Sequence, residues 1–350
     1  MDPRYAAGVT ADQVLLAAPR GFCAGVEMAI KALATMVRTF PAPVYCYHEI
    51  VHNQEVVRRF EEQGVVFVDS IEEVPQGSPI MLSAHGSAPD VVADAEQTGS
   101  FTVNSVCPLV TKVHHEVRVR VGKGFRVVYV GHEGHEEAVG TMAVAPDAIN
   151  RVESIEDVAA LPDFDEPLAL LAQTTLSHRD WSDVADAAQE RFPEMWTPAR
   201  SDLCFATTNR QSALLSFVDR CDAMIVIGSP NSSNTLALAK LATESGCKIV
   251  LRVNSAAELP DDLRGIVGVT AGASAPEELV EEVIAKLAPT NGVEEVRVVD
   301  EDEYFPPPPP IRDLLTALST AASVTVGGPV INSIGSDRYV GASQVLAELL

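Results

Sequence analysis

Three cysteines stand on turns that lead into helical patterns. They are Cys23 in PRGFCAGVEMAI, Cys107 in TVNSVCPLVTKV and Cys204 in RSDLCFATTNRQ. Backbone N–H groups and the dipole at a helix N-terminus favour the thiolate, which is the form of cysteine that binds metals. A lone cysteine on such a turn is most simply a small apolar side chain that fills a gap. Three equivalent turns indicate instead a shared metal or cluster site.

The spacing of the cysteines disfavours some kinds of metal site. Structural zinc sites usually draw on close pairs such as C-x-x-C, and the chain has no such pair. A four-iron cluster normally takes four cysteines, so a cluster held by three leaves one iron with an open position. The other cysteines, Cys46, Cys221 and Cys247, lie within or just before apolar strand patterns and are predicted to be structural.

Histidines and small polar residues gather at the ends of predicted strands. Each alone is more often a helix cap or a satisfied structural residue, but together they suit a phosphate or diphosphate pocket. The residues are His52 in HEIVHNQ, His85 in SAHGSAP, His135 and Glu137 in GHEGHEEAVGT, Ser232, Ser233 and Asn234 in GSPNSSNTLALA, and Ser274 in TAGASAP. The sequence therefore predicts an anion pocket beside the cysteine turns.

The overall charge disfavours one class of partner. The chain has 49 acidic and 25 basic residues, with a formal net charge of −24. Nucleic-acid binding needs clustered lysine and arginine, so we expect no nucleic-acid partner. One basic stretch, HHEVRVRVGKGFR, carries Arg118, Arg120, Lys123 and Arg126 and is a candidate docking patch.

The composition also indicates a compartment. No apolar run approaches the ~18 residues that a membrane span requires, and the N-terminus MDPRYAAGVTADQ lacks the layout of a signal peptide. Six cysteines in 350 residues do not form a disulfide scaffold. We therefore expect a cytoplasmic protein with free or metal-bound thiols and no membrane association.

The elements that must position these residues alternate along the chain. Short Val/Ile-rich strands such as VLLAAP, RVVYVGHEG and AMIVIGSP are each followed by a polar turn and a helical pattern. This βαβ alternation predicts an α/β fold with mainly parallel sheets, whose ligands gather at the carboxyl ends of the strands. We expect three similar α/β domains, over residues 14–107, 108–200 and 201–290, each with one turn cysteine. Residues 291–350 are expected to hold a stiff polyproline segment, Pro306 to Pro310, and from residue 316 a poorly specified tail.

The motifs of this chain resemble those of a known family. RGFCAGV, HEIVHN, SAHG, CPLVTKVH, GHEGHEE, QTTLS, CFATTNRQ, GSPNSSN and VTAGASAP are similar, in order, to the signatures of the 4-hydroxy-3-methylbut-2-enyl diphosphate reductase (IspH/LytB) family. The resemblance covers about Val14 to Leu287. It implies an oxidoreductase with three α/β domains around an iron–sulfur cluster. The implied reaction is a two-electron reductive dehydroxylation that yields isopentenyl and dimethylallyl diphosphate, the last step of the methylerythritol phosphate route to isoprenoids.

The resemblance also implies roles for individual residues. Cys23, Cys107 and Cys204 would hold a [4Fe–4S] cluster with one open iron, and Glu137 would be the proton donor, relayed through Thr174 of QTTLS. The residues implied to bind substrate are His52, His85, His135, Thr174, Thr207, Ser232, Ser233, Asn234 and Ser274. One motif departs from the family, which commonly has Gly-His-Pro-Glu where this chain has Glu136 in place of the proline.

The implied partners are a small allylic diphosphate and, as electron donor, ferredoxin or flavodoxin. Two alternatives come from other classes. One is a zinc-dependent phosphohydrolase with the thiols and histidines as ligands. The other is a non-catalytic phosphometabolite-binding protein. Iron with acid-labile sulfide distinguishes the reductase from both.

Overall fold

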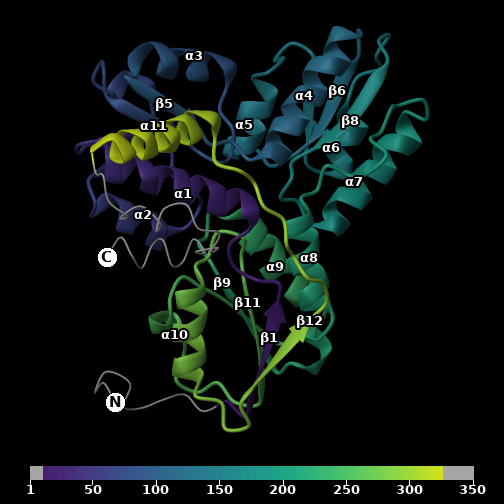
Figure 1. Ribbon diagram of the computed structural model, residues 1–350. Coiled ribbons are helices and arrows are strands. Elements are labelled where there is room, and N and C mark those ends of the chain that lie inside the picture. Colours follow the sequence, from purple (N-terminus) through teal and green to yellow (C-terminus); the bar gives the residue numbers. More distant parts are fainter. Residues whose placement is uncertain (1–10, 326–350) are drawn as a thin grey trace.

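The computed structural model describes residues 11–325, with side chains to residue 320. These residues form three separate sheets in which every strand pair is parallel (Figure 1). The α/β class and the three mainly parallel sheets predicted from the sequence are confirmed.

The largest sheet combines both ends of the described chain. Its strand order is β10-β9-β11-β1-β12. The strands are β1 (Gln13–Ala18), β9 (Ala223–Ile227), β10 (Ile249–Val253), β11 (Ile266–Ala271) and β12 (Val293–Arg297). The helices that accompany them in sequence are α8 (Phe205–Leu215), α9 (Ser233–Glu244) and α10 (Glu277–Leu287), with the short helices η3 (Val218–Arg220) and η4 (Ala256–Glu258).

The second sheet has the order β3-β2-β4-β5. Its strands are β2 (Val44–Tyr47), β3 (Val65–Val68), β4 (Pro79–Leu82) and β5 (Phe101–Asn104). Its helices are α1 (Ala24–Thr39), α2 (Gln54–Glu61) and α3 (Pro89–Thr98), with the short helix η2 (Ile71–Glu73). The core under α1 is built mainly from aliphatic side chains around the fully buried Phe60, and Phe22, Phe40, Phe67 and Phe101 pack against it.

The third sheet is the smallest, with the order β7-β6-β8. Its strands are β6 (Arg126–Val130), β7 (Ile149–Val152) and β8 (Leu168–Ala172). Its helices are α4 (Pro108–Gly122), α5 (Glu136–Met142), α6 (Ile155–Ala160) and α7 (His178–Arg191). Strand β8 is buried on both faces, as expected for a strand that helices cover on both sides.

The first strand lies in a different sheet from the one its chain position suggests. The expected first unit, 14–107, contains β1, whereas β1 pairs with β11 and with β12. Five of its six residues are buried, so this strand needs a neighbour on each side and a helix layer on each face. The order of strands in a parallel sheet does not have to follow the chain, and the burial of β1 is satisfied in the largest sheet. The other domain boundaries stay predictions.

The C-terminal segment is more ordered than the sequence suggested. Pro309 and Pro310 form the first turn of a helix, α11 (Pro309–Thr325), where proline is favourable because the first helical N–H groups have no partner. Ile311 is buried in the core beneath α1, and a side chain of this size contributes about 1.5–3 kcal/mol when fully buried. Figure 1 shows α11 beside α1. The expectation of a poorly specified tail from residue 316 is therefore wrong up to Thr325, and residues 326–350 lie outside the described part.

The three cysteines predicted to be structural occupy apolar surroundings. Cys46 is fully buried in the core beneath α1, and Cys247 is buried in the core beneath α8 and α9, with Cys221 packed against it. All six cysteines are free thiols.

Two of the four residues of the basic patch, Arg120 and Arg126, form contacts within the chain. The guanidinium of Arg120 lies 3.4 Å from the centre of the Trp196 ring, and Arg126 forms an ion pair with Glu166. Only Arg118 and Lys123 are exposed. Among the helices of residues 11–325, none has the length and apolarity that crossing a membrane requires.

Candidate functional site

The three predicted ligand cysteines occupy equivalent local positions. Cys23, Cys107 and Cys204 are the N-cap residues of α1, α4 and α8, and none forms a side-chain capping hydrogen bond. N-caps are usually Ser, Thr, Asp or Asn, whose side chains satisfy the free N–H groups of the first turn. Cysteine caps poorly, so its presence at three helix starts indicates that the sulfur serves another purpose.

Backbone hydrogen bonds tie each cysteine to another strand-end segment. The N–H of Cys23 donates to the carbonyl of Ala273, at 3.1 Å. The N–H of Cys107 donates to Ala84 at 3.0 Å, and that of Cys204 to Thr174 at 2.9 Å. These acceptors are Thr174 itself and the neighbours of Ser274 and His85. The chain therefore couples each cysteine turn to a segment with a predicted substrate residue.

A cavity of about 100 Å³ is lined by the predicted site residues. All thirteen residues named from the sequence line it: Cys23, Cys107, Cys204, His52, His85, His135, Glu137, Thr174, Thr207, Ser232, Ser233, Asn234 and Ser274. These residues lie in loops and helix starts that follow strands of all three sheets. The structure therefore brings the whole predicted set together, and the roles of its members stay predictions.

The cysteine thiols influence one another. Burial raises the pKa of Cys107 to about 12, and the neighbouring Cys23 adds to the rise. Burial, with the charges of Cys23 and Cys107, raises the pKa of Cys204. The raised pKa values keep these thiols protonated near neutral pH, and a bound cation would stabilise their thiolate form. A methyl group at Gly25 would lie 2.8 Å from the Cys107 sulfur, so glycine keeps the space between the sulfurs free.

Glu137 is the buried acid of the cavity. Thr174 holds both of its oxygens: the backbone N–H donates to Oε1 at 2.7 Å and the hydroxyl Oγ1 donates to Oε2 at 3.0 Å. Burial raises the pKa of Glu137 to about 7, although the two bonds from Thr174 oppose the rise. A carboxyl group with this pKa can carry a proton near neutral pH and release it, as a general acid requires.

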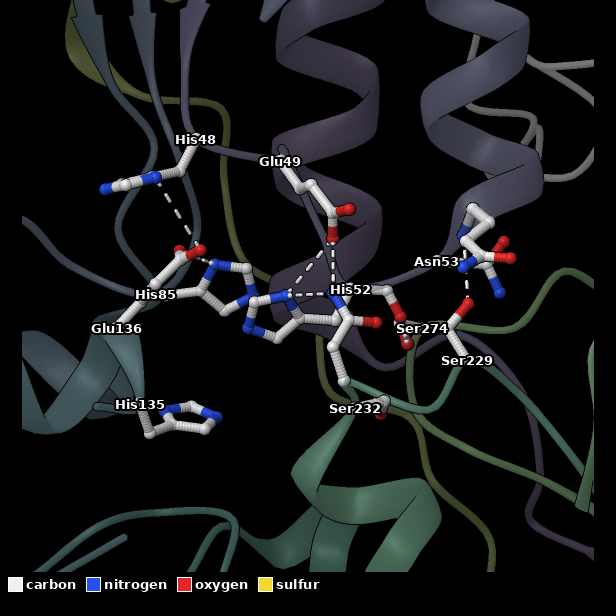
Figure 2. Close-up of polar contacts among 12 residues, drawn as sticks. His48, Glu49, His52, Asn53, His85, His135, Glu136, Ser229, Ser232 and Ser274 are labelled. Atoms are coloured by element: carbon white, nitrogen blue, oxygen red, sulfur yellow. Dashed lines mark hydrogen bonds and ion pairs between the residues drawn. The ribbon is translucent and has the colours of Figure 1, made fainter. Parts of the chain in front are cut away.

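Three histidine rings also line the cavity, and Figure 2 shows them near one another. The rings of His52 and His85 are stacked, with centroids 3.8 Å apart and planes at 14°, and His135 meets them edge-on. Burial, with the charges of His85, His52 and His132, lowers the pKa of His135 to about 3. The Nε2 atoms of His52 and His135 are buried without a hydrogen-bond partner among the described residues. Such atoms need a polar ligand.

The same histidines do not form a ready cation site. Ligand atoms of His52, His85 and Glu136 all lie within 4.8 Å of one another. A metal ion must lie in the plane of each imidazole that binds it, because the nitrogen lone pair lies in that plane. Two rings stacked face to face at 14° cannot both direct a lone pair at one ion. This arrangement suits an anion held by N–H groups.

The polar end of the cavity lies at the start of α9. Ser232 is its N-cap, and its side chain accepts from the N–H of Thr235. Asn234 is only 3% exposed, yet neither amide atom has a partner among the described residues. Ser274 donates to the carbonyl of His52 at 2.8 Å. A helix N-terminus with a buried unpartnered amide beside it is suited to an anionic ligand.

Some residues that shape the site were missed. Arg210 on α8 is 1% exposed and binds the carbonyls of Gly21 and Phe22, which precede Cys23. Asn231 donates to Glu49 at 2.8 Å, and Glu49 contacts His52. Arg210 follows CFATTN directly, so its position in that motif was the available signal. Asn231 stands in GSPNSSN beside the predicted residues.

The comparisons with known proteins agree with this geometry. A family model described as LytB protein matches residues 14–288. A 4-hydroxy-3-methylbut-2-enyl diphosphate reductase from Rhodopirellula baltica is 46% identical over 314 residues, covering 87% of this chain and 97% of the relative. The reductase of the same name from Cereibacter sphaeroides is 45% identical over 305 residues, covering 85% and 96%.

Solved structures show the same fold. The structure of the E-1-hydroxy-2-methyl-but-2-enyl-4-diphosphate reductase from Plasmodium falciparum matches with a TM-score of 0.84 and 29% identity, covering 88% of this chain and 99% of that one. A second reductase, described as the terminal enzyme of the non-mevalonate pathway, matches with a TM-score of 0.58 and 27% identity, covering 79% and 98%.

The three sheets, the shared cavity and these relatives define an α/β oxidoreductase. More particularly, the chain belongs to the LytB family, whose curated relatives carry the name 4-hydroxy-3-methylbut-2-enyl diphosphate reductase. The family, enzyme class and function predicted from the sequence are confirmed, and neither the phosphohydrolase nor the binding-protein alternative is favoured.

Proposed function

We propose that this chain binds a [4Fe–4S] cluster on Cys23, Cys107 and Cys204 and reduces 4-hydroxy-3-methylbut-2-enyl diphosphate. The reaction consumes two electrons and two protons, breaks the allylic C–O bond, forms a C–H bond and releases water. The products are isopentenyl and dimethylallyl diphosphate. The observation that carries the proposal is the convergence of three cysteine N-caps, one buried acid and an anion pocket on one cavity.

The donor set fits such a cluster. Thiolates are the usual ligands of iron–sulfur clusters. Burial and the neighbouring sulfurs raise the pKa of Cys107 and Cys204, so a bound cation would be needed to stabilise their thiolate form. Gly25 leaves room between Cys23 and Cys107 that any side chain would occupy. When bound, a cluster held by three cysteines supplies single electrons and an iron that accepts a further ligand.

The polar end would bind the diphosphate. The unpartnered amide of Asn234, the α9 N-terminus at Ser232 and the buried ring nitrogens of His52 and His135 all lack a ligand that a diphosphate could provide. Its oxygens accept hydrogen bonds from N–H and O–H donors, and its charge is stabilised at a helix N-terminus. Ser233, Ser274 and Thr207 line the same space.

Glu137 would supply a proton. The C–O bond breaks more easily when the leaving oxygen is protonated, and a carboxyl group with a pKa of about 7 is well matched to this role. Thr174 holds the carboxyl in place through two bonds and, by its hydroxyl, offers a route for the proton. The side chain is 2% exposed, so bulk water does not compete for its proton.

For the electron donor we propose ferredoxin or flavodoxin. Arg118 and Lys123 are the exposed members of the basic patch and would contact such an acidic protein. Reversing both charges should slow reduction by the protein donor and leave reduction by a small chemical reductant unchanged. Equal rates with the protein donor would show that the patch has no part in docking.

The test of the proposed function begins with anaerobic purification. The protein should absorb in the visible range and contain iron and acid-labile sulfide in near-equal amounts. The Cys23→Ser variant should lose most of the iron, whereas Cys221→Ser, a change at a similarly half-buried thiol outside the cavity, should keep it. Zinc without sulfide, or an equal loss of iron from both variants, would refute the proposal.

A further inference from the structure

The carboxylate of Glu136 lies against the ring of His85. Its Oε2 atom is 2.9 Å from Nδ1 of His85, and its Oε1 atom is 3.8 Å from Nδ1 of His48 (Figure 2). Glu136 is the first residue of α5, directly after the N-cap His135. Its side chain is 23% exposed, so the contact with His85 is only partly screened by water. The family resemblance expects a proline here, and no family role accounts for this carboxylate.

A carboxylate at this distance constrains the protonation of the ring. The two atoms are at ion-pair distance without completing a hydrogen bond among the described residues, and their contact is favourable when Nδ1 carries a hydrogen. A neutral imidazole with that hydrogen has none on Nε2. A phosphate oxygen needs an N–H donor. If His85 is to donate to a phosphate and keep its contact with Glu136, the ring must be a cation with both nitrogens protonated.

The other charges around His85 oppose this state in part. Burial and the neighbouring His52 lower the pKa of His85, whereas Glu136 and Glu49 act to raise it. The pKa of Glu136 falls to about 2, because its contacts with His85, His52 and His48 outweigh its burial. The charged or titratable groups around this pair are Cys46, Tyr47, His48, Glu49, His52 and His135, and Asp69 contacts His48 behind them. Glu136 thus stays a carboxylate at any pH near neutrality.

We propose that Glu136 is a positioning residue that stabilises a proton on His85 when a diphosphate binds, so that anion binding is accompanied by proton uptake. This inference rests on the proposed diphosphate pocket. The carboxylate also carries a cost, because its own charge repels the anion. At a pH at which His85 is already protonated, the only effect of Glu136 is to repel the bound anion. At a pH at which His85 is neutral, Glu136 favours the protonated ring that the anion needs.

This balance predicts affinity curves that cross. Glu136→Gln keeps the shape of the side chain and removes the charge. At low pH the variant should bind a diphosphate more tightly than the parent protein, and at high pH more weakly. We expect the pH midpoint of binding to fall by about one unit, which changes the variant-to-parent affinity ratio roughly tenfold between pH values below and above both midpoints.

The experiment measures the dissociation constant of inorganic pyrophosphate for the cluster-loaded protein from pH 5.5 to 8.5 by calorimetry. The ratio of variant to parent constants cancels the ionisation of pyrophosphate itself. Measurements in two buffers with different ionisation enthalpies give the number of protons taken up. Glu133→Gln is the matched control, because Glu133 is an exposed carboxylate of the same motif, with its side chain 85% exposed.

Crossing curves, with less proton uptake by Glu136→Gln and no change for Glu133→Gln, would support the inference. In a His85→Asn background the Glu136 change should no longer shift the midpoint. A ratio that stays constant with pH would overturn the inference and leave the diphosphate pocket intact. No binding of pyrophosphate by the parent protein at any pH would overturn the pocket and the inference together. Glu136→Pro, which restores the family residue, provides a second variant with the same expected shift.

Discussion

The guanidinium Nη2 of Arg210 lies 2.7 Å from the carbonyl oxygen of Gly21, two residues before Cys23. The same side chain contacts the carbonyl of Phe22 and forms an ion pair with Glu301 at 3.0 Å. Arg210 is on the helix that begins at Cys204, and Glu301 belongs to the segment between β12 and α11. One buried cation therefore joins two cysteine turns to the C-terminal segment.

We expect Glu301→Gln to weaken both folding and cluster retention. Removing one partner of a buried ion pair leaves the other charge uncompensated, and here the side chains are 1% and 10% exposed. The loss of unfolding free energy should be about 3 kcal/mol. Denaturant unfolding of the cluster-free protein measures it, and iron release to a chelator measures retention.

The pair of Arg220 and Glu294 provides the control for this change. Both side chains are nearly half exposed, so Glu294→Gln should cost at most about 1 kcal/mol. If the two variants unfold alike, the Arg210 cluster of contacts does not stabilise the cysteine turns.

The Glu137→Gln variant should retain the cluster and lose about 10²–10⁴-fold in turnover, because an amide cannot act as a general acid. The parent enzyme should lose activity as the pH rises through about 7, since the protonated form of Glu137 dominates only below its pKa. Above that pH the rate should fall roughly tenfold per unit. Turnover of the variant near the parent rate would remove Glu137 from the mechanism.

Thr174→Val should shift the loss of activity with rising pH to a higher pH. The hydroxyl of Thr174 donates to the ionised carboxylate and so lowers its pKa, and valine removes that bond while the backbone N–H remains. The loss of one such bond corresponds to about one unit. Turnover measured against pH checks the shift. Thr208→Val, whose hydroxyl bonds the carbonyl of Phe205 instead, should leave this pH dependence unchanged. A fall in rate at every pH without a shift would indicate a proton relay alone.

Gly25→Ala should lower the iron content of the purified protein. Its methyl group would lie 2.8 Å from the Cys107 sulfur and 3.4 Å from its Cβ, so the thiol must move. Gly122→Ala, also in a helix, meets nothing within 4 Å and should keep the full iron content. Unfolding of the two cluster-free variants shows whether the fold is preserved. Full iron content in Gly25→Ala would mean that the sulfurs have more freedom than their packing suggests.

The sequence allowed the site to be located because its residues lie at strand ends and helix starts. Cys23, Cys107 and Cys204 stand on turns, and the carboxyl ends of parallel strands meet, so local patterns were enough to predict one shared cavity. The placement of β1 could not be predicted in this way. Its apolar run indicates a buried strand, but several sheets could accept it, and the partner strands lie some 250 residues away in the chain.

Residues that act through a neighbour were the ones missed. Arg210 lies on an ordinary helical pattern, and only the packing of three segments reveals that it is buried. The sequence shows that Glu136 departs from the family, but its contact with His85 joins segments of two different sheets and has no local signature. Helix α11 could not be predicted because its apolar pattern is weak, and Ile311 is the only fully buried side chain among its described residues.

The three cysteine turns belong to helices from three different sheets. A cofactor held by all of them is therefore a cross-link between units that are far apart in the chain, and it constrains long loops of the unfolded polypeptide. Oxidative loss of that cross-link should convert one cooperative melting transition into several overlapping ones. Damage by oxygen would then abolish the chemistry of the cavity and also weaken the association of the three sheets with one another.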